Sequence, residues 1–266
     1  MYPFRRILIP TDFSTASEWV FDDAVRIAGT DHAEILILHI RMTSKAHPDE
    51  LRFPADPSLY EYAEKQELEL LRDRVRRANA HVATRLVVKK GPEAGTEICR
   101  TAVEEDADLI VIATHARHHV AHLLIGSTTV SVIADPPAPV LSIRYGVRKR
   151  TTLRRIVVPV HLKQTSRAAF DLATAIATRE GGEVHAVTVC SPAARGEAEA
   201  HIAALASSAA GVRTHIITGN DIEREIVRFA QSSDADVIFL NSQGPVGDAK
   251  AAMIRHASTP VMVVPK

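Results

Sequence analysis

The chain reads Arg5-Arg6-Ile7-Leu8-Ile9-Pro10 near its start and Arg154-Arg155-Ile156-Val157-Val158-Pro159 in its middle, at an offset of 149 residues. Short β-branched runs of this kind are typical of buried strands. The same offset relates seven more identical pairs: Ser17/Ser166, Phe21/Phe170, Asp22/Asp171, Ala24/Ala173, Ile27/Ile176, Ala28/Ala177 and Glu34/Glu183. The first part of the chain is therefore repeated in its second half.

The repeat continues at two smaller offsets. At 128 residues the matches are Gly91/Gly219, Glu97/Glu225, Ile98/Ile226, Arg100/Arg228, Ala102/Ala230, Asp106/Asp234, Ala107/Ala235, Asp108/Asp236 and Ile110/Ile238. At 121 residues they are Ile133/Ile254, Pro139/Pro260 and Val140/Val261. Because the order is kept while the offset falls twice, the second copy has lost 21 residues in one place and 7 in another. We expect two domains, residues 1–146 and 153–266, with a basic, turn-rich linker around 145–152.

Composition excludes several classes of function. Among 266 residues, 32 Lys and Arg balance 32 Asp and Glu, and aromatic residues make up 5%. This predicts neither the clustered positive charge nor the stacking platforms of nucleic-acid binders. No apolar run approaches the ~20 residues of a membrane span, and we see no signal peptide. Two cysteines cannot form a disulfide framework or a zinc site alone. We expect a soluble, cytoplasmic protein.

Each copy alternates strand and helix patterns. In the first copy we expect strands at 7–10, 34–40, 84–89, 109–113 and 140–143, and helices at 14–28, 57–81, 93–105 and 127–134. The helix at 197–210 is the shortened counterpart of 57–81. This alternation predicts two tandem doubly wound α/β domains of Rossmann-like type, each with a five-stranded, mostly parallel sheet. Such sheets bind ligands beyond the carboxyl ends of their strands, where the strand order reverses.

Three polar segments follow predicted strands. Asp12 is a candidate for a ribose or adenine contact, or else a helix-capping acid. His39 is a ligand contact or a packed histidine at the edge of the core. Gly126 opens a helix that begins Ser127-Thr128, where free N–H groups and the helix dipole favour phosphate. Many helices begin in this way for capping alone.

The whole pattern resembles the universal stress proteins in their tandem two-domain form. The resemblance covers nearly the full chain and rests on residues 7–14 (Ile-Leu-Ile-Pro-Thr-Asp-Phe-Ser), 38–40, 107–112, 114–115, 123–127 and 138–141. It implies a regulatory stress-response protein that binds an adenine nucleotide, ATP with or without magnesium, in the first domain. The residues implied as contacts are Pro10, Thr11, Asp12, Ile40, Ala113, Ala116, Arg117, Gly126, Ser127 and Thr128.

The chain departs from the family's phosphate loop in the first copy. Members that bind ATP carry Gly-x-x-Gly, nine residues and then Gly-Ser/Thr, but Ala113 and Ala116 stand at the first two glycines. Each alanine resists positive φ and crowds a phosphate, at a cost of about 1 kcal/mol. That cost weakens binding about fivefold to tenfold per site. Arg117 could offset part of it through a charge-assisted contact.

The second copy departs further. His161 replaces Asp12, the loop is seven residues shorter, and Asp248 follows Gly247 at the helix start. A carboxylate at a helix N-terminus repels a second anion. We expect this copy to have lost the nucleotide site and to pack against the first copy. The resemblance implies that their last strands, 140–143 and 261–264, pair as in the family's dimers; whether the chain forms a further homodimer is left open.

The sequence gives less support to metal binding and to catalysis. The histidines at 115, 118, 119 and 122 could ligate zinc, but no acid or cysteine lies nearby in sequence, so we expect no metal. No nucleophile–base–acid pattern is visible, so we expect no enzyme, or at most a slow ATP hydrolase. The alternative to nucleotide binding is a stress or interaction scaffold in which both sites are degenerate.

Overall fold

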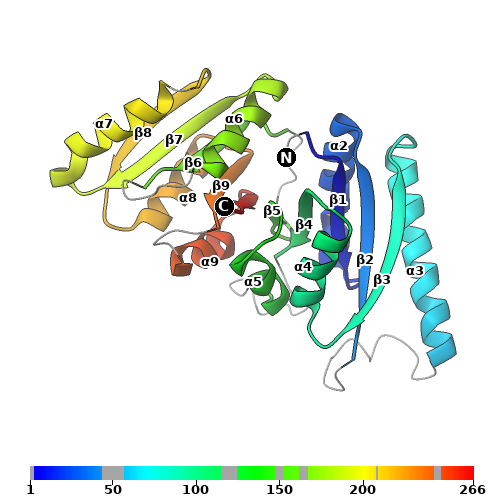
Figure 1. The fold of residues 1–266 in the computed structure, drawn as a ribbon. Helices are drawn as coiled ribbons and strands as arrows, with labels where there is room; N and C mark the ends of the chain where they lie inside the picture. Colours follow the sequence, from blue (N-terminus) through cyan, green and yellow to red (C-terminus); the bar gives the residue numbers. More distant parts are fainter. Residues whose placement is uncertain are drawn as a thin grey trace.

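A single sheet of ten strands runs through both copies of the repeat (Figure 1). The computed structural model describes residues 3–43, 57–114, 125–147, 152–161, 167–207, 209–242 and 247–266. Within these residues the strand order is β3-β2-β1-β4-β5-β10-β9-β6-β7-β8. The second half of this order mirrors the first, as a duplicated domain requires.

The first domain is a parallel five-stranded unit. Its strands are β1 (Arg6–Thr11), β2 (Glu34–Met42), β3 (Thr84–Gly91), β4 (Leu109–Ala113) and β5 (Val140–Ile143). Its helices are α1 (Thr15–Trp19), α2 (Phe21–Asp31), α3 (Pro57–Ala78), α4 (Ala94–Glu104) and α5 (Ser127–Ala134). Each neighbouring pair of these strands is parallel, which confirms the predicted doubly wound fold.

The second domain repeats this plan. Its strands are β6 (Arg155–Pro159), β7 (Glu183–Cys190), β8 (Val212–Thr218), β9 (Val237–Asn241) and β10 (Val261–Val264). Its helices are α6 (Ala168–Glu180), α7 (Arg195–Ala206), α8 (Ile222–Ser232) and α9 (Gly247–His256), with a 3₁₀ turn at Pro192–Ala194. These strands are also parallel to their neighbours within the domain.

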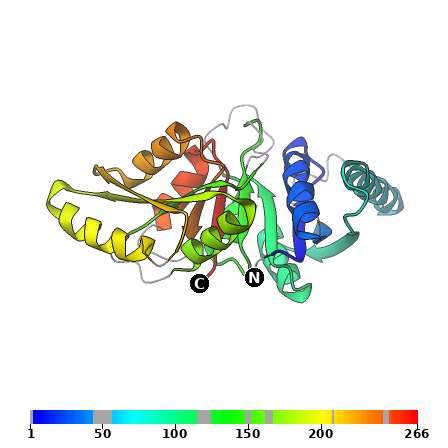
Figure 2. The same ribbon diagram turned by 90° about the horizontal axis from the view of Figure 1, so that it is seen from above.

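Helices cover both faces of the sheet (Figure 2). Helices α2, α3, α6 and α7 pack on one face, and α4, α5, α8 and α9 pack on the other. Successive strand residues point to opposite faces, so Ile7 and Ile9 join the first layer and Leu8 joins the second. Each apolar cluster contains residues from both domains, and the two domains therefore share their cores.

The domains meet where β5 pairs antiparallel with β10. Leu141 lies opposite Met262, and the Ser142 hydroxyl donates to the Val261 carbonyl at 2.9 Å. Beside this junction Arg179, near the end of α6, forms a 2.7 Å ion pair with the buried carboxylate of Asp31 at the end of α2. The pairing confirms the expectation that one chain joins its two copies through their last strands.

The helix predicted at 14–28 is wrong as a single element. It is divided at Val20 into α1 and α2. The first piece is fastened to the end of β1, because Ser14 caps it and the Ser17 hydroxyl lies 3.2 Å from the Thr11 hydroxyl. The second piece instead follows the sheet and buries Phe21 and its apolar neighbours against it. The two pieces therefore have different anchors, which a periodicity in sequence does not show.

Candidate functional site

The first domain reverses its strand order between β1 and β4. Strand β1 pairs with β2 on one side and with β4 on the other, and the chain passes from β3 through α4 to reach β4. Ligands of such sheets bind beyond the strand ends at this reversal. Thr11 ends β1 and Ala113 ends β4, so the predicted contacts at these positions lie at the edge where a ligand is expected.

The loop after β1 is held in one conformation by its own polar groups. Asp12 Oδ1 accepts from the Ser14 amide at 3.0 Å, and the Thr11 hydroxyl accepts from the Phe13 amide at 3.0 Å. Phe13 has a positive φ of 57° and is fully buried. A bulky residue in that backbone region is unusual and is retained only where its surroundings fix it. The position of Asp12 is therefore set by the fold.

His39 fixes the same loop from the neighbouring strand. Its Nδ1 lies 3.0 Å from the Thr11 carbonyl and so donates to it, and its ring lies 4.4 Å from the Phe13 ring between centroids. Burial lowers the pKa of His39, so the imidazole is neutral near pH 7. The structure thus supports the packed interpretation of His39, as a residue that positions the loop.

Behind His39, a buried carboxylate joins β2 to α3. The Glu64 side chain is 4% exposed, and its two oxygens accept from Arg41 Nε at 2.6 Å and Arg41 Nη2 at 2.8 Å. Arg41 also pairs with Glu61 at 2.6 Å, and Tyr60 Oη lies 3.4 Å from His39 Nε2. This network holds the start of α3 beside the end of β2.

The start of α5 supplies the N–H groups expected to meet a phosphate. Gly126 is the N-cap, with φ −61° and ψ 143°, and Thr129 Oγ1 donates to the Ala113 carbonyl at 3.1 Å. The helix start is thereby tied to the end of β4. A Cβ built on Gly126 meets no heavy atom within 4 Å among the described residues. Neither its φ nor its packing against these residues requires a glycine here.

The predicted contacts are therefore only partly assembled in the described structure. Pro10, Thr11 and Asp12 at the end of β1 and Ala113 at the end of β4 share one edge of the sheet with Gly126, Ser127 and Thr128. Ile40 lies near the end of β2 and is 9% exposed, and its side chain belongs to the core on the α4 and α5 side. Ala116 and Arg117 lie outside the described residues, as does the whole histidine cluster at 115–122.

The corresponding edge of the second domain is occupied by its own side chains. Asn241, at the end of β9, accepts from the Ala169 amide at the start of α6 at 2.9 Å. Lys250 on α9 stands where the first domain has Thr129, and its ammonium group donates to the Ser242 carbonyl at 3.0 Å. The same group crosses to the first domain and donates to the Ile133 carbonyl at 2.8 Å. Burial lowers the pKa of Lys250.

Sequence reasoning missed Lys250 and the Arg41–Glu64 pair. The pair joins residues 23 positions apart, and no local motif marks such a contact. Lys250 could have been found by comparing the two copies, because a lysine replaces a threonine at a position that both copies bury. Among the described residues, no three His, Cys, Asp or Glu side chains converge in a way that could hold a metal ion. Each described helix is also too short or too polar to cross a bilayer.

Comparisons with known proteins agree with this architecture. The model of the universal stress protein family matches residues 3–144 and again 152–265. A Staphylococcus saprophyticus protein named as a universal stress protein is 26% identical over 154 residues, which cover 54% of this chain and 86% of that protein.

Solved structures match over both domains. A universal stress protein from Archaeoglobus fulgidus has a TM-score of 0.77 at 18% identity and covers 99% of either chain. A Pseudomonas aeruginosa structure described in the same terms has a TM-score of 0.69 at 16% identity and covers 99% of this chain and 94% of its own. At these identities the likeness concerns the fold, while the double family match concerns the sequence. The chain therefore belongs to the universal stress protein family, as a member with two tandem domains.

Proposed function

We propose that the first domain binds one adenine nucleotide, ATP, and that the protein acts as a regulatory nucleotide-binding member of the stress response. The observation that supports this most is the asymmetry between the two domains at equivalent edges of the sheet. In the first domain, Asp12 and Gly126 lie at the strand reversal, and no described residue would contact a Cβ at Gly126. In the second domain, the larger Asn241 and Lys250 replace Ala113 and Thr129 and bond to the backbone there.

The start of α5, Asp12 and Gly126 would have separate roles in binding the nucleotide. The first N–H groups of α5, from Ser127 onward, would donate to phosphate oxygens, because they have no partner within the helix. Asp12 would accept from a ribose hydroxyl. Gly126 would allow the phosphates to approach the backbone. Magnesium would accompany the phosphates as their counter-ion, and the proposal includes no catalytic step.

Calorimetric titration with ATP and magnesium tests the proposal. We expect one site per chain with modest affinity. Placing glycine at both loop positions, Ala113→Gly with Ala116→Gly, should tighten binding about tenfold or more, because each alanine methyl group crowds the phosphates at a cost of about 1 kcal/mol. Ala113 ends β4 without a positive φ, so crowding and not backbone strain is the cause there. Asp12→Asn keeps an acceptor for the Ser14 amide but loses the charge, and should weaken binding about tenfold.

A matched pair of glycine substitutions controls for folding. Gly126→Val should abolish binding without unfolding the protein, because described neighbours leave room for a side chain. Gly196→Val on α7 is the control, since a Cβ there also meets no described atom within 4 Å, and it should leave binding unchanged. Asp248→Ser should not create a second site. Two sites per chain, or none even in the double-glycine protein, would contradict the proposal, and the second outcome would favour a scaffold without nucleotide.

A further inference from the structure

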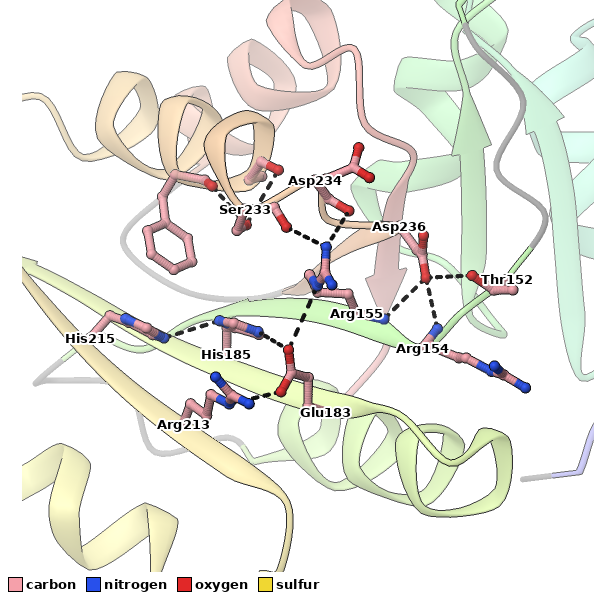
Figure 3. A network of polar contacts seen from close by, with 12 residues as sticks. Thr152, Arg154, Arg155, Glu183, His185, Arg213, His215, Ser233, Asp234 and Asp236 are labelled. Atoms are coloured by element: carbon pink, nitrogen blue, oxygen red, sulfur yellow. Dashed lines mark hydrogen bonds and ion pairs between the residues drawn. The ribbon is translucent and has the colours of Figure 1, made fainter.

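A chain of three titratable side chains lies in the second domain, away from the strand-end site (Figure 3). Glu183 and His185 are on β7, and His215 is on the outermost strand, β8. Glu183 Oε1 lies 3.0 Å from His185 Nε2, and His185 Nδ1 lies 3.0 Å from His215 Nε2. The three groups therefore form a continuous line of hydrogen bonds across two strands.

The contacts define where the protons are. Glu183 is an acceptor, so His185 carries its proton on Nε2 and uses the bare Nδ1 as an acceptor when it is neutral. His215 must then donate from Nε2, and its own Nδ1 remains as the acceptor of the line. His185 is 6% exposed, whereas His215 is half-buried. A proton from solvent can thus enter through His215.

The line can take one added proton without losing a bond, but not two. A proton on Nδ1 of His215 leaves both hydrogen bonds intact. A second proton would go to Nδ1 of His185, which would then face the Nε2–H of His215 as a second donor. The hydrogen bond between the two strands would be lost, and two cations would lie side by side in a largely buried place.

Burial, and after it the neighbouring positive charge, makes even the first proton unfavourable. Arg213 on β8 and Arg155 on β6 already pair with Glu183, at 2.7 Å and 3.6 Å. From α8, Phe229 faces both imidazoles, with ring centroids 5.9 Å from His185 and 4.6 Å from His215. The charged residues nearby on that helix, Glu225 and Arg228, pair with each other, and the Ser233 and Asp234 carbonyls accept from Arg155.

The first domain provides an internal comparison. Its Glu34 pairs with Arg6 at 3.2 Å and with Arg85 at 3.6 Å, as Glu183 pairs with the equivalent arginines. The positions of the two histidines, however, hold Leu36 and Val87, both buried. The position of Phe229 holds Thr101. The ion pairs are therefore common to both domains, whereas the imidazoles are particular to the second.

We propose that Glu183, His185 and His215 form an acid-sensing proton relay, which loosens the edge strand β8 and lowers the stability of the second domain as the pH falls below neutral. Burial, followed by the neighbouring His185 and Arg213, lowers the pKa of His215 from its ordinary 6.5. The unfolded chain then binds more protons than the folded chain below pH 6.5, so stability falls with pH. The pKa of Glu183 is lowered chiefly by its hydrogen bond from His185. Protonation of this carboxylate at lower pH therefore causes a further loss of stability.

Grafting the residues of the first domain onto the second tests the relay. Urea unfolding and hydrogen exchange are measured from pH 7.5 to 5.5 for the natural protein and for His185→Leu with His215→Val. In the natural protein the folded-to-unfolded ratio should fall more steeply than in the graft, by up to about tenfold for one group that titrates in this range. Protection of the β8 amides should fall further in the natural protein than in the graft, while that of the equivalent edge strand β3, which pairs with the strand of the buried His39, should fall equally in both.

A second variant guards against misfolding of the graft. His215→Gln can still donate to His185 Nδ1 but cannot take up a proton, so it should remove the part of the acid dependence that is due to His215 while stability at pH 7.5 is kept. His81→Asn, at an exposed histidine of the first domain, is the control and should keep the natural pH profile. The relay is refuted if His215→Gln shows the same loss of stability and of β8 protection as the natural protein.

Discussion

At the scale of single residues, one buried carboxylate organises the surroundings of the candidate site. Glu64 is almost fully buried, whereas the side chain of Arg41 is 21% exposed. Without the arginine, the buried carboxylate would face His39, whose Nε2 lies 3.7 Å from Glu64 Oε2 and whose imidazole is neutral near pH 7. The cost of burying an unpaired charge exceeds the worth of the pair itself.

We therefore expect Arg41→Met to be more harmful than removal of both partners. The single variant should lose about 2–3 kcal/mol of stability, the value of hydrogen bonds to a charged group. The double variant Arg41→Met with Glu64→Met should recover much of this loss. Arg195→Met, which removes an exposed arginine paired with the exposed Glu199, should change little. Urea unfolding at pH 7.5 gives the stability of the natural protein and of the three variants. A double variant as unstable as Arg41→Met would contradict this expectation.

At the scale of elements, α5 and α9 are joined across the junction by one ammonium group. Lys250 donates to the Ile133 carbonyl, which lies in the last turn of α5, where carbonyls have no partner within the helix. A cation at a helix C-terminus is also favoured by the helix dipole. The bond ties the second domain to the helix whose other end carries the proposed phosphate site.

Lys250→Met should lower stability by about 1–3 kcal/mol at pH 7.5, because the Ile133 and Ser242 carbonyls lose their donor. The difference should also depend on pH. The pKa of Lys250 is lowered in the folded protein from its ordinary 10.5, so near that pH the unfolded chain binds more protons and the natural protein gains stability as pH rises. The variant should lack this gain. Urea midpoints at pH 7.5 and 9.5 measure this gain in stability. The same change in midpoint for the natural protein and the variant would contradict the prediction.

The elements that the sequence predicted well are those with a local cause. Buried β-branched runs predicted β4 and β5, and a Gly-Ser start predicted α5. The structure has all three elements with the predicted bounds. The division of the first helix at Val20 was not readable, because it depends on a contact between Ser17 and the end of β1. The relay was also missed, since His185 and His215 are 30 residues apart and meet only when β7 and β8 pair. A comparison of the copies, Leu36 with His185 and Val87 with His215, would have indicated it.

At the scale of the whole molecule, the sheet and both of its apolar layers are continuous from one domain to the other. Leu141 of β5 and Met262 of β10 lie opposite each other and are 2% and 0% exposed. Neither domain can unfold without exposing core residues of the other. The fold therefore predicts one cooperative transition near neutral pH for all ten strands.

Leu141→Ala should lower the stability of both domains together, by about 2–5 kcal/mol. The chain has one tryptophan, Trp19 in the first domain, so its fluorescence follows that domain while far-UV circular dichroism follows the whole chain. At pH 7.5 both signals should give the same urea midpoint, in the natural protein and in the variant. Val103→Ala, at a side chain 64% exposed, is the control. Separate midpoints for the two signals would show that the domains unfold independently.

The junction between β5 and β10 also affects how a protein with two tandem domains can evolve. When two identical subunits pair through the same strand, a mutation in that strand appears in both subunits. The mutated strand must then pair with an identically mutated strand across the two-fold axis. Within one chain the two sides are inherited separately. The hydroxyl of Ser142 bonds across the junction, while the equivalent position of the other copy is Val263. A tandem protein with this junction can therefore acquire substitutions in one domain while the other domain is unchanged. The two domains are also present in a one-to-one ratio at any protein concentration.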